Sequence, residues 1–187
     1  LFINRIVNII NDPDIMFKYI QAGVITNNFI EVQRVIKEYD NYDPAKILDF
    51  FLNDKKLVDP KPLIILCDKH DYIEQLTVYL YKNKLSRFLE NYVIQLRPQS
   101  TPRVLGALID EDCDEAYIKQ LLNTVRGNCP IEPLVDEFVK RNKVRVLQKF
   151  LEDRESEGNP TPALHNALAM IYIESNPKHA EDFLIQN

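Results

Sequence analysis

Glycine is scarce in this sequence. Only four occur, Gly23, Gly106, Gly127 and Gly158, while Leu, Ile, Lys, Glu, Asp and Asn dominate. An all-β protein needs many turn residues between its short strands. The lack of glycine therefore argues against an all-β fold and predicts an all-α one.

Cysteine is equally scarce, and the three cysteines, Cys67, Cys113 and Cys129, lie far apart with no Cys-x-x-Cys pair. An odd number of widely spaced cysteines does not form the framework of a small disulfide-rich protein. We expect buried, reduced thiols and a cytoplasmic protein.

Long apolar runs, an opening signal segment and a glycine-rich phosphate loop are all missing from the sequence. Insertion into a membrane and nucleotide hydrolysis thus have no sequence support. The chain begins at Leu1 without methionine and stops just after the apolar pair Phe183-Leu184. We expect both ends to be cut from a longer helical array.

The chain also lacks a strong net charge of either sign. The 23 Lys and Arg residues and 28 Asp and Glu residues give a net charge of −5, and the two signs alternate along the chain. A nucleic-acid partner would need basic residues gathered on one face, and so would a membrane-surface helix. We expect neither partner.

What the sequence does have is helical periodicity, most clearly in the stretch from Lys61 to Leu85. Its first part, Pro62 to Cys67, is wholly apolar, and from Asp71 onward apolar residues recur at helical spacing around Leu76. The pattern predicts two helices joined by a polar turn, with the first helix buried on most sides and Asp71 capping the start of the second.

Helix starts are marked by a capping residue followed by proline: Asp12-Pro13, Asp43-Pro44, Thr101-Pro102, Thr161-Pro162 and Asn176-Pro177. Proline suits the first helical position because the N–H that it lacks would have no partner there. We expect Gly23, Gly127 and Gly158 to end helices. The segment 153–161, DRESEGNPT, is expected to be a loop.

The expected helices start about 15 residues apart, so that a helix pair repeats about every 30 residues. Even spacing of short helices indicates an α-solenoid, in which each hairpin packs only on its neighbours, and not a globin or a four-helix bundle. About a dozen helices of roughly 8 to 14 residues are predicted, with no strand.

Two sets of polar residues could in principle carry chemistry. Cys67 and His70, near Asp68 and Asp71, offer metal ligands, but a zinc site needs about four ligands and there is no second Cys/His pair. Residues 110–115, DEDCDE, form an acidic cluster whose spacing fits no EF-hand loop. Acids there are favoured by the dipole of the helix that follows, so we interpret the cluster as structural.

Cys129 with Asp136, and His165 with Asn166, could be assembled into a Cys-His-Asn arrangement. No nucleophile motif surrounds them, and these residue types are common enough to occur by chance. We therefore predict no catalytic, cofactor-binding or metal site, no cofactor, and a protein that is not an enzyme.

Long segments of the sequence closely resemble the leg of the clathrin heavy chain. They are DPDIMFKYIQA, PLIILCDKHDYIEQLTVYLYKNKL, VLGALIDEDC, YIKQLLNTVRG, LVDEFVKRNK and HNALAMIYIESN, in unbroken order over nearly the whole chain. The resemblance implies the distal part of the leg, and a right-handed superhelix of short helix hairpins that forms an extended, curved rod. It also implies that residues 1–157 form one repeat, with 1–11 the tail of an earlier repeat, and that 158–187 begin the next.

The function implied by the resemblance is structural. The leg would pack against neighbouring heavy-chain legs to build the lattice of coated pits and vesicles, on the cytoplasmic face of the membrane. Trimerisation would occur through a hub outside this segment, and light chain and adaptors would bind elsewhere on the full chain. The alternative is an α-solenoid tethering or adaptor subunit of a vacuolar or endosomal sorting complex.

Overall fold

The computed structural model describes residues 12–53, 58–125, 127–158 and 161–175, and the single residues 180, 181, 183 and 185. Every regular element in this part of the chain is helical, and none of its residues is in a strand. The all-α prediction is therefore confirmed. The chain divides into two compact units, Leu1–Tyr79 and Leu80–Asn187.

The first unit holds four complete helices and most of a fifth. They are α2 (Pro13–Ile25), α3 (Phe29–Glu38), α4 (Pro44–Asn53), α5 (Lys61–His70) and α6 (Ile73–Lys82), of which α6 runs past the end of the unit. Helix α3 packs on both α2 and α5, and α4 packs on α5. These contacts join helices that are one or two places apart along the chain.

Helix α5 is the most deeply buried helix of the first unit. Five of its ten residues are buried, namely Pro62, Leu63, Ile64, Leu66 and Cys67. The apolar run from Pro62 to Cys67 has no polar face to turn toward water, and in the structure α5 packs on both α3 and α4. The prediction of a buried helix is confirmed, as is the burial of Leu76 in α6, which has no exposed surface.

The second unit continues with helices of similar length. They are α7 (Ser86–Asn91), a π-helical turn η1 (Tyr92–Leu96), a 3₁₀ turn η2 (Pro98–Ser100), α8 (Thr101–Asp110), α9 (Glu115–Val125), α10 (Ile131–Lys140), a 3₁₀ turn η3 (Val144–Leu147), α11 (Gln148–Ser156) and α12 (Pro162–Ser175). Helix α7, with six residues, is shorter than predicted because the π turn replaces its last part.

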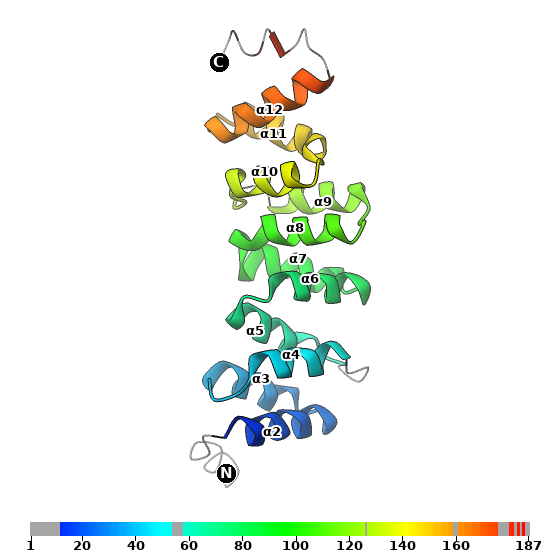
Figure 1. Cartoon of the computed structure of the whole chain (residues 1–187), viewed down its shortest axis with the longest axis vertical. Coiled ribbons are helices and arrows are strands. Elements are labelled where there is room, and N and C mark those ends of the chain that lie inside the picture. The colour runs from blue at the N-terminus through cyan, green and yellow to red at the C-terminus, as the bar shows by residue number, and fades with distance from the viewer. Residues whose placement is uncertain are drawn as a thin grey trace. The chain divides into compact units, whose positions relative to one another are not determined.

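The helices of this unit form two layers (Figure 1). Helices α8, α10 and α12 follow one another in one layer, and α9 packs on α11 in the other. From α8 onward, each helix therefore contacts the helix two places along the chain, and α8 with α9 and α11 with α12 make contacts between the layers. This packing on near neighbours is that of an α-solenoid, as predicted.

The predicted capping residues are confirmed at three helix starts. The Oδ1 atom of Asp12 accepts a hydrogen bond from the backbone N–H of Asp14 at 2.9 Å. Asp43 accepts from the N–H groups of Ala45 and Lys46 at the start of α4. Thr161 Oγ1 accepts from the N–H of Leu164 at 3.3 Å. Each bond satisfies a donor that the helix itself leaves without a partner.

Thr101 does not act as the predicted cap. It is the first residue of α8, is fully buried, and donates its hydroxyl hydrogen to the carbonyl oxygen of Pro98 at 2.7 Å. The preceding 3₁₀ turn runs directly into α8, so the helix begins one residue earlier than the proline suggests. The Asn176-Pro177 start lies outside the described residues.

Two other local predictions, on Gly23 and on the loop over 153–161, are wrong. Helix α2 continues past Gly23 to Ile25, and the chain reverses at Asn27, whose φ is +56°. Asp71, with φ +62°, closes α5, and its N–H donates to the carbonyl oxygen of Cys67. The expected loop over 153–161 is shorter, because α11 extends to Ser156.

No helix of the described residues is both long enough and apolar enough to cross a membrane.

Candidate functional site

The last residue of α5, His70, lies against Tyr42, a residue 28 positions earlier in the sequence. Nε2 of His70 and the hydroxyl oxygen of Tyr42 lie 2.9 Å apart, and that hydroxyl is 3.1 Å from the carbonyl oxygen of Ile36. Because Tyr42 donates its single hydrogen to Ile36, Nε2 of His70 must be the donor to Tyr42. Burial, together with the nearby charge of Lys69, lowers the pKa of His70.

Lys69 completes this contact between α5 and the end of α3. Its ammonium group donates to the carbonyl oxygens of Ile36 and Tyr39 at 2.9 and 2.6 Å, and pairs with the carboxylate of Asp40 at 2.6 Å. The last carbonyls of a helix have no partners within it, and a cation there also interacts favourably with the helix dipole. The last turn of α5 thus holds α3 and α5 together.

Cys67 and His70, the candidate metal ligands, take part in packing. The Cys67 thiol is fully buried, and burial raises its pKa to about 12, so that it stays protonated at neutral pH. His70 directs its Nε2 atom to Tyr42. No group of three or more His, Cys, Asp and Glu side chains in the described part of the chain is arranged to hold a metal ion.

The acidic cluster at 110–115 is divided among separate structural contacts. Asp110 accepts two hydrogen bonds from Arg141, at 2.7 and 2.6 Å, and Glu111 pairs with Lys82 at 2.8 Å. Asp114 accepts from the N–H of Ala116 in the first turn of α9. These three carboxylates therefore have separate partners, which supports the structural interpretation.

Arg141 joins two helices of the α8–α10–α12 layer. Arg141, the C-cap residue of α10, pairs with Asp110 at the end of α8 and with Glu137 of α10. The Arg141 guanidinium holds the pKa of Asp110 below its usual value. Gly106 leaves room for this pair, because a Cβ there would lie 2.7 Å from Oε2 of Glu137.

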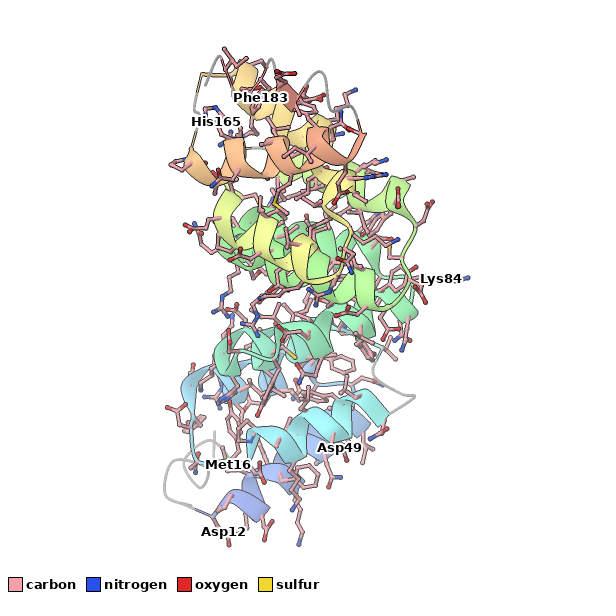
Figure 2. The ribbon with its side chains drawn as sticks, turned by 45° about the horizontal axis from the view of Figure 1, so that its top comes forward. Asp12, Met16, Asp49, Lys84, His165 and Phe183 are labelled. Carbon is pink, nitrogen blue, oxygen red and sulfur yellow. The ribbon has the colours of Figure 1, made fainter. Side chains whose placement is uncertain are left out.

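Cys129 and His165 do not form a nucleophile and base. Burial raises the pKa of Cys129 to about 12, whereas a reactive cysteine has a lowered pKa. Its proposed companion Asp136 is exposed. His165 lies 3.5 Å from Glu155 and meets the ring of Phe183 edge-on, with centroids 5.9 Å apart (Figure 2). Asn166 is exposed on α12.

Two features of the second unit were not predicted from the sequence. A pocket of about 520 Å³ lies at the first turns of α10 and α12, with Arg154 in its wall. A second, smaller pocket of about 160 Å³ is lined by Tyr81, Lys84, Ser86 and Tyr117. Contacts between segments distant in the sequence create both pockets, so no local pattern indicates them.

The exposed surface carries scattered charges. Lys84, labelled in Figure 2, Arg87 and Lys119 are exposed, and so is Glu74 on α6. Most ion pairs of the structure also lie at least partly in solvent, such as that of Lys119 with Glu115 at 3.7 Å. Such a surface suits many weak, salt-sensitive contacts better than one tight site.

The chain is similar to a known protein family and to several curated proteins. The family described as "Region in Clathrin and VPS" matches residues 2–116 and 122–187. The chain is 47% identical over its whole length to the clathrin heavy chain of Dictyostelium discoideum and covers 11% of that protein. It is 45% identical over 186 residues to clathrin heavy chain 2 of Homo sapiens, again 11% of that protein.

A similar match is found with the probable clathrin heavy chain of Schizosaccharomyces pombe, at 41% identity over 186 residues. The chain thus spans about a tenth of the length of the curated relatives that it matches. The matched family covers nearly all of the chain, and the helical packing described above agrees with it. The chain belongs to the family of helical regions found in clathrin and VPS proteins, and over its whole length it is similar to clathrin heavy chains.

Proposed function

We propose that this chain is a structural segment of the leg of a clathrin heavy chain. The observation that carries the proposal is the 47% identity over the whole chain to a clathrin heavy chain. The two-layered packing of α8 to α12 supports it, because a stack of short helices forms an extended support for contacts.

The segment acts by contact with the legs of neighbouring molecules. A surface ion pair contributes only about 0 to 1 kcal/mol, so that no single pair holds a lattice together. Many such contacts, repeated along several legs, give a high total affinity while each remains reversible. The location that follows is the cytoplasmic face of coated pits and vesicles. Light chain and adaptors bind other parts of the full chain.

Within this proposal, residues 1–157 are one repeat of the heavy chain and 158–187 begin the next. Gly158, with φ +81°, lies in the turn after α11, where the chain leaves the first repeat. Neither part needs a cofactor or a catalytic residue for this role.

A group of charge reversals in the full-length heavy chain tests the proposed function. Lys84→Glu, Arg87→Glu and Lys119→Glu change exposed side chains, so helicity and melting temperature should stay almost unchanged. The protein concentration needed for cage assembly, measured by light scattering, should shift, and the shift should become smaller as salt is raised.

Reversals on other exposed faces of the segment serve as comparisons. If grouped reversals on several faces all leave assembly unchanged but abolish the binding of one soluble partner, the chain is a tethering or adaptor solenoid and the proposal is wrong.

A further inference from the structure

The larger pocket of the second unit lies where three helices meet. Helix α12 packs on both α10 and α11, and the pocket opens at the first turns of α10 and α12. Its volume of about 520 Å³ is within the range of roughly 300 to 1,000 Å³ that is usual for ligand sites. The described residues of the wall are mostly apolar and include Pro130, Ile131, Pro133 and Pro162.

Arg154 of α11 is the cation in this wall. Its side chain is only 15% exposed, and one of its terminal nitrogens, Nη1, lies 3.2 Å from Glu157. Its Nε atom is buried and has no hydrogen-bond acceptor. A buried N–H without an acceptor is unfavourable, and Arg presents Nε–H and an adjacent terminal N–H along one edge that matches a carboxylate.

The N-terminal ends of α10 and α12 add positive potential at the pocket. Each helix N-terminus acts as about half a positive charge, and α10 and α12 both begin at the pocket. Pro130, the N-cap residue of α10, provides no side-chain cap for that helix. These two ends reinforce the charge of Arg154.

Two carboxylates oppose this potential. Glu132 lies in the pocket wall, and Glu157 pairs with Arg154. Glu132 is exposed and the Glu157 side chain is 41% exposed, so that water screens both more strongly than it screens the buried guanidinium. Arg154 is the one cation among the described residues of the wall.

We propose that this pocket binds a short acidic peptide segment of a partner protein. A carboxylate of the peptide pairs with the Nε edge of Arg154, and apolar side chains beside it cover the three prolines of the wall. Because Nε has almost no exposed surface, the guanidinium turns toward the pocket as the carboxylate enters. The apolar wall favours a peptide over a small inorganic anion, which would leave the prolines in water.

The test is photo-crosslinking to the full-length heavy chain, mapped by mass spectrometry so that binding elsewhere on the protein is not counted. The probe is a terminally blocked six-residue peptide with a central Glu, leucine on either side and a benzophenone group. The control peptide carries Gln in place of Glu. We expect cross-links at residues 129–133 and 161–163, and about tenfold fewer with the control peptide, which corresponds to the loss of one charge-assisted pair.

Two protein variants make the test independent of misfolding. Arg154→Gln should lower cross-linking at the pocket about tenfold, and Glu132→Gln should raise it severalfold, a gain that a folding defect does not produce. The proposal is overturned if no cross-link maps to the pocket, if the two peptides label it equally, or if Arg154→Gln has no effect. Displacement of the peptide by equimolar sulfate would also overturn it, because the apolar wall would then add nothing to binding.

Discussion

Gly23 of α2 lies so close to Val32 of α3 that a Cβ atom at Gly23 would be 2.5 Å from Cγ2 of Val32. Both positions are inside helices, and Val32 is buried. The glycine is therefore required by the close approach of two helices, and not by the end of a helix. This contact gives a direct test of the packing in the first unit.

Gly23→Ala should destabilise the protein. Alanine has a higher helix propensity than glycine, worth up to about 1 kcal/mol, but overpacking a well-packed contact costs about 1 to 3 kcal/mol. We expect a net loss of about 1 kcal/mol in the free energy of unfolding, measured by urea denaturation. Combining Gly23→Ala with Val32→Ala should cost less than the sum of the two single changes. Gly127→Ala, where nothing lies within 4 Å of the new Cβ, is the control.

Leu76→Ala tests the buried face of α6. Leu76 has no exposed surface, so its truncation should cost about 2 to 5 kcal/mol. Hydrogen exchange should show the loss of protection first around α5 and α6, because solenoid helices are stabilised by their neighbours. Gln75→Ala, at an exposed position of α6, should leave exchange unchanged. An equal loss of protection along the whole chain would instead indicate a single cooperative core.

His70 should make the stability of the protein depend on pH. Its pKa is lowered in the folded state, so the unfolded chain binds a proton more readily. Stability is then greatest above the unfolded pKa of about 6.5 and falls as the pH decreases through that value. Urea denaturation at pH 7.5 and 5.5 should show this decrease, and His70→Gln should reduce it. A decrease of the same size in the variant would assign the effect to other groups.

The Arg141 network should contribute little, because Asp110 is 58% exposed. Asp110→Asn is expected to lower the free energy of unfolding by less than about 1 kcal/mol, and by still less in 1 M NaCl. The lowered pKa of Asp110 means that its contribution is present above the unfolded pKa of about 3.9 and is lost as the pH falls through the folded pKa. Arg87→Gln is a matched change at an exposed cation. It should alter neither the free energy of unfolding nor the dependence of that free energy on pH.

Much of the fold could be predicted from the sequence because helix starts have local causes. Asp12 and Asp43 cap the helices next to them, and the apolar spacing around Leu76 identifies a buried face without reference to the rest of the chain. Gly23 was misinterpreted because its role depends on Val32 in another helix. The same reason applies to Arg154, which was assigned to a loop although it lies in α11 against the start of α12.

The central claim is that this chain is a structural segment of a clathrin leg, and a segment exchange tests it most directly. The 187 residues would replace the matching part of the Dictyostelium discoideum heavy chain, to which they are 47% identical, and the purified chimaera would be examined by electron microscopy under assembly conditions. We predict closed cages at a protein concentration similar to that of the parent. A chimaera that folds and trimerises but forms no cages at any concentration would contradict the claim.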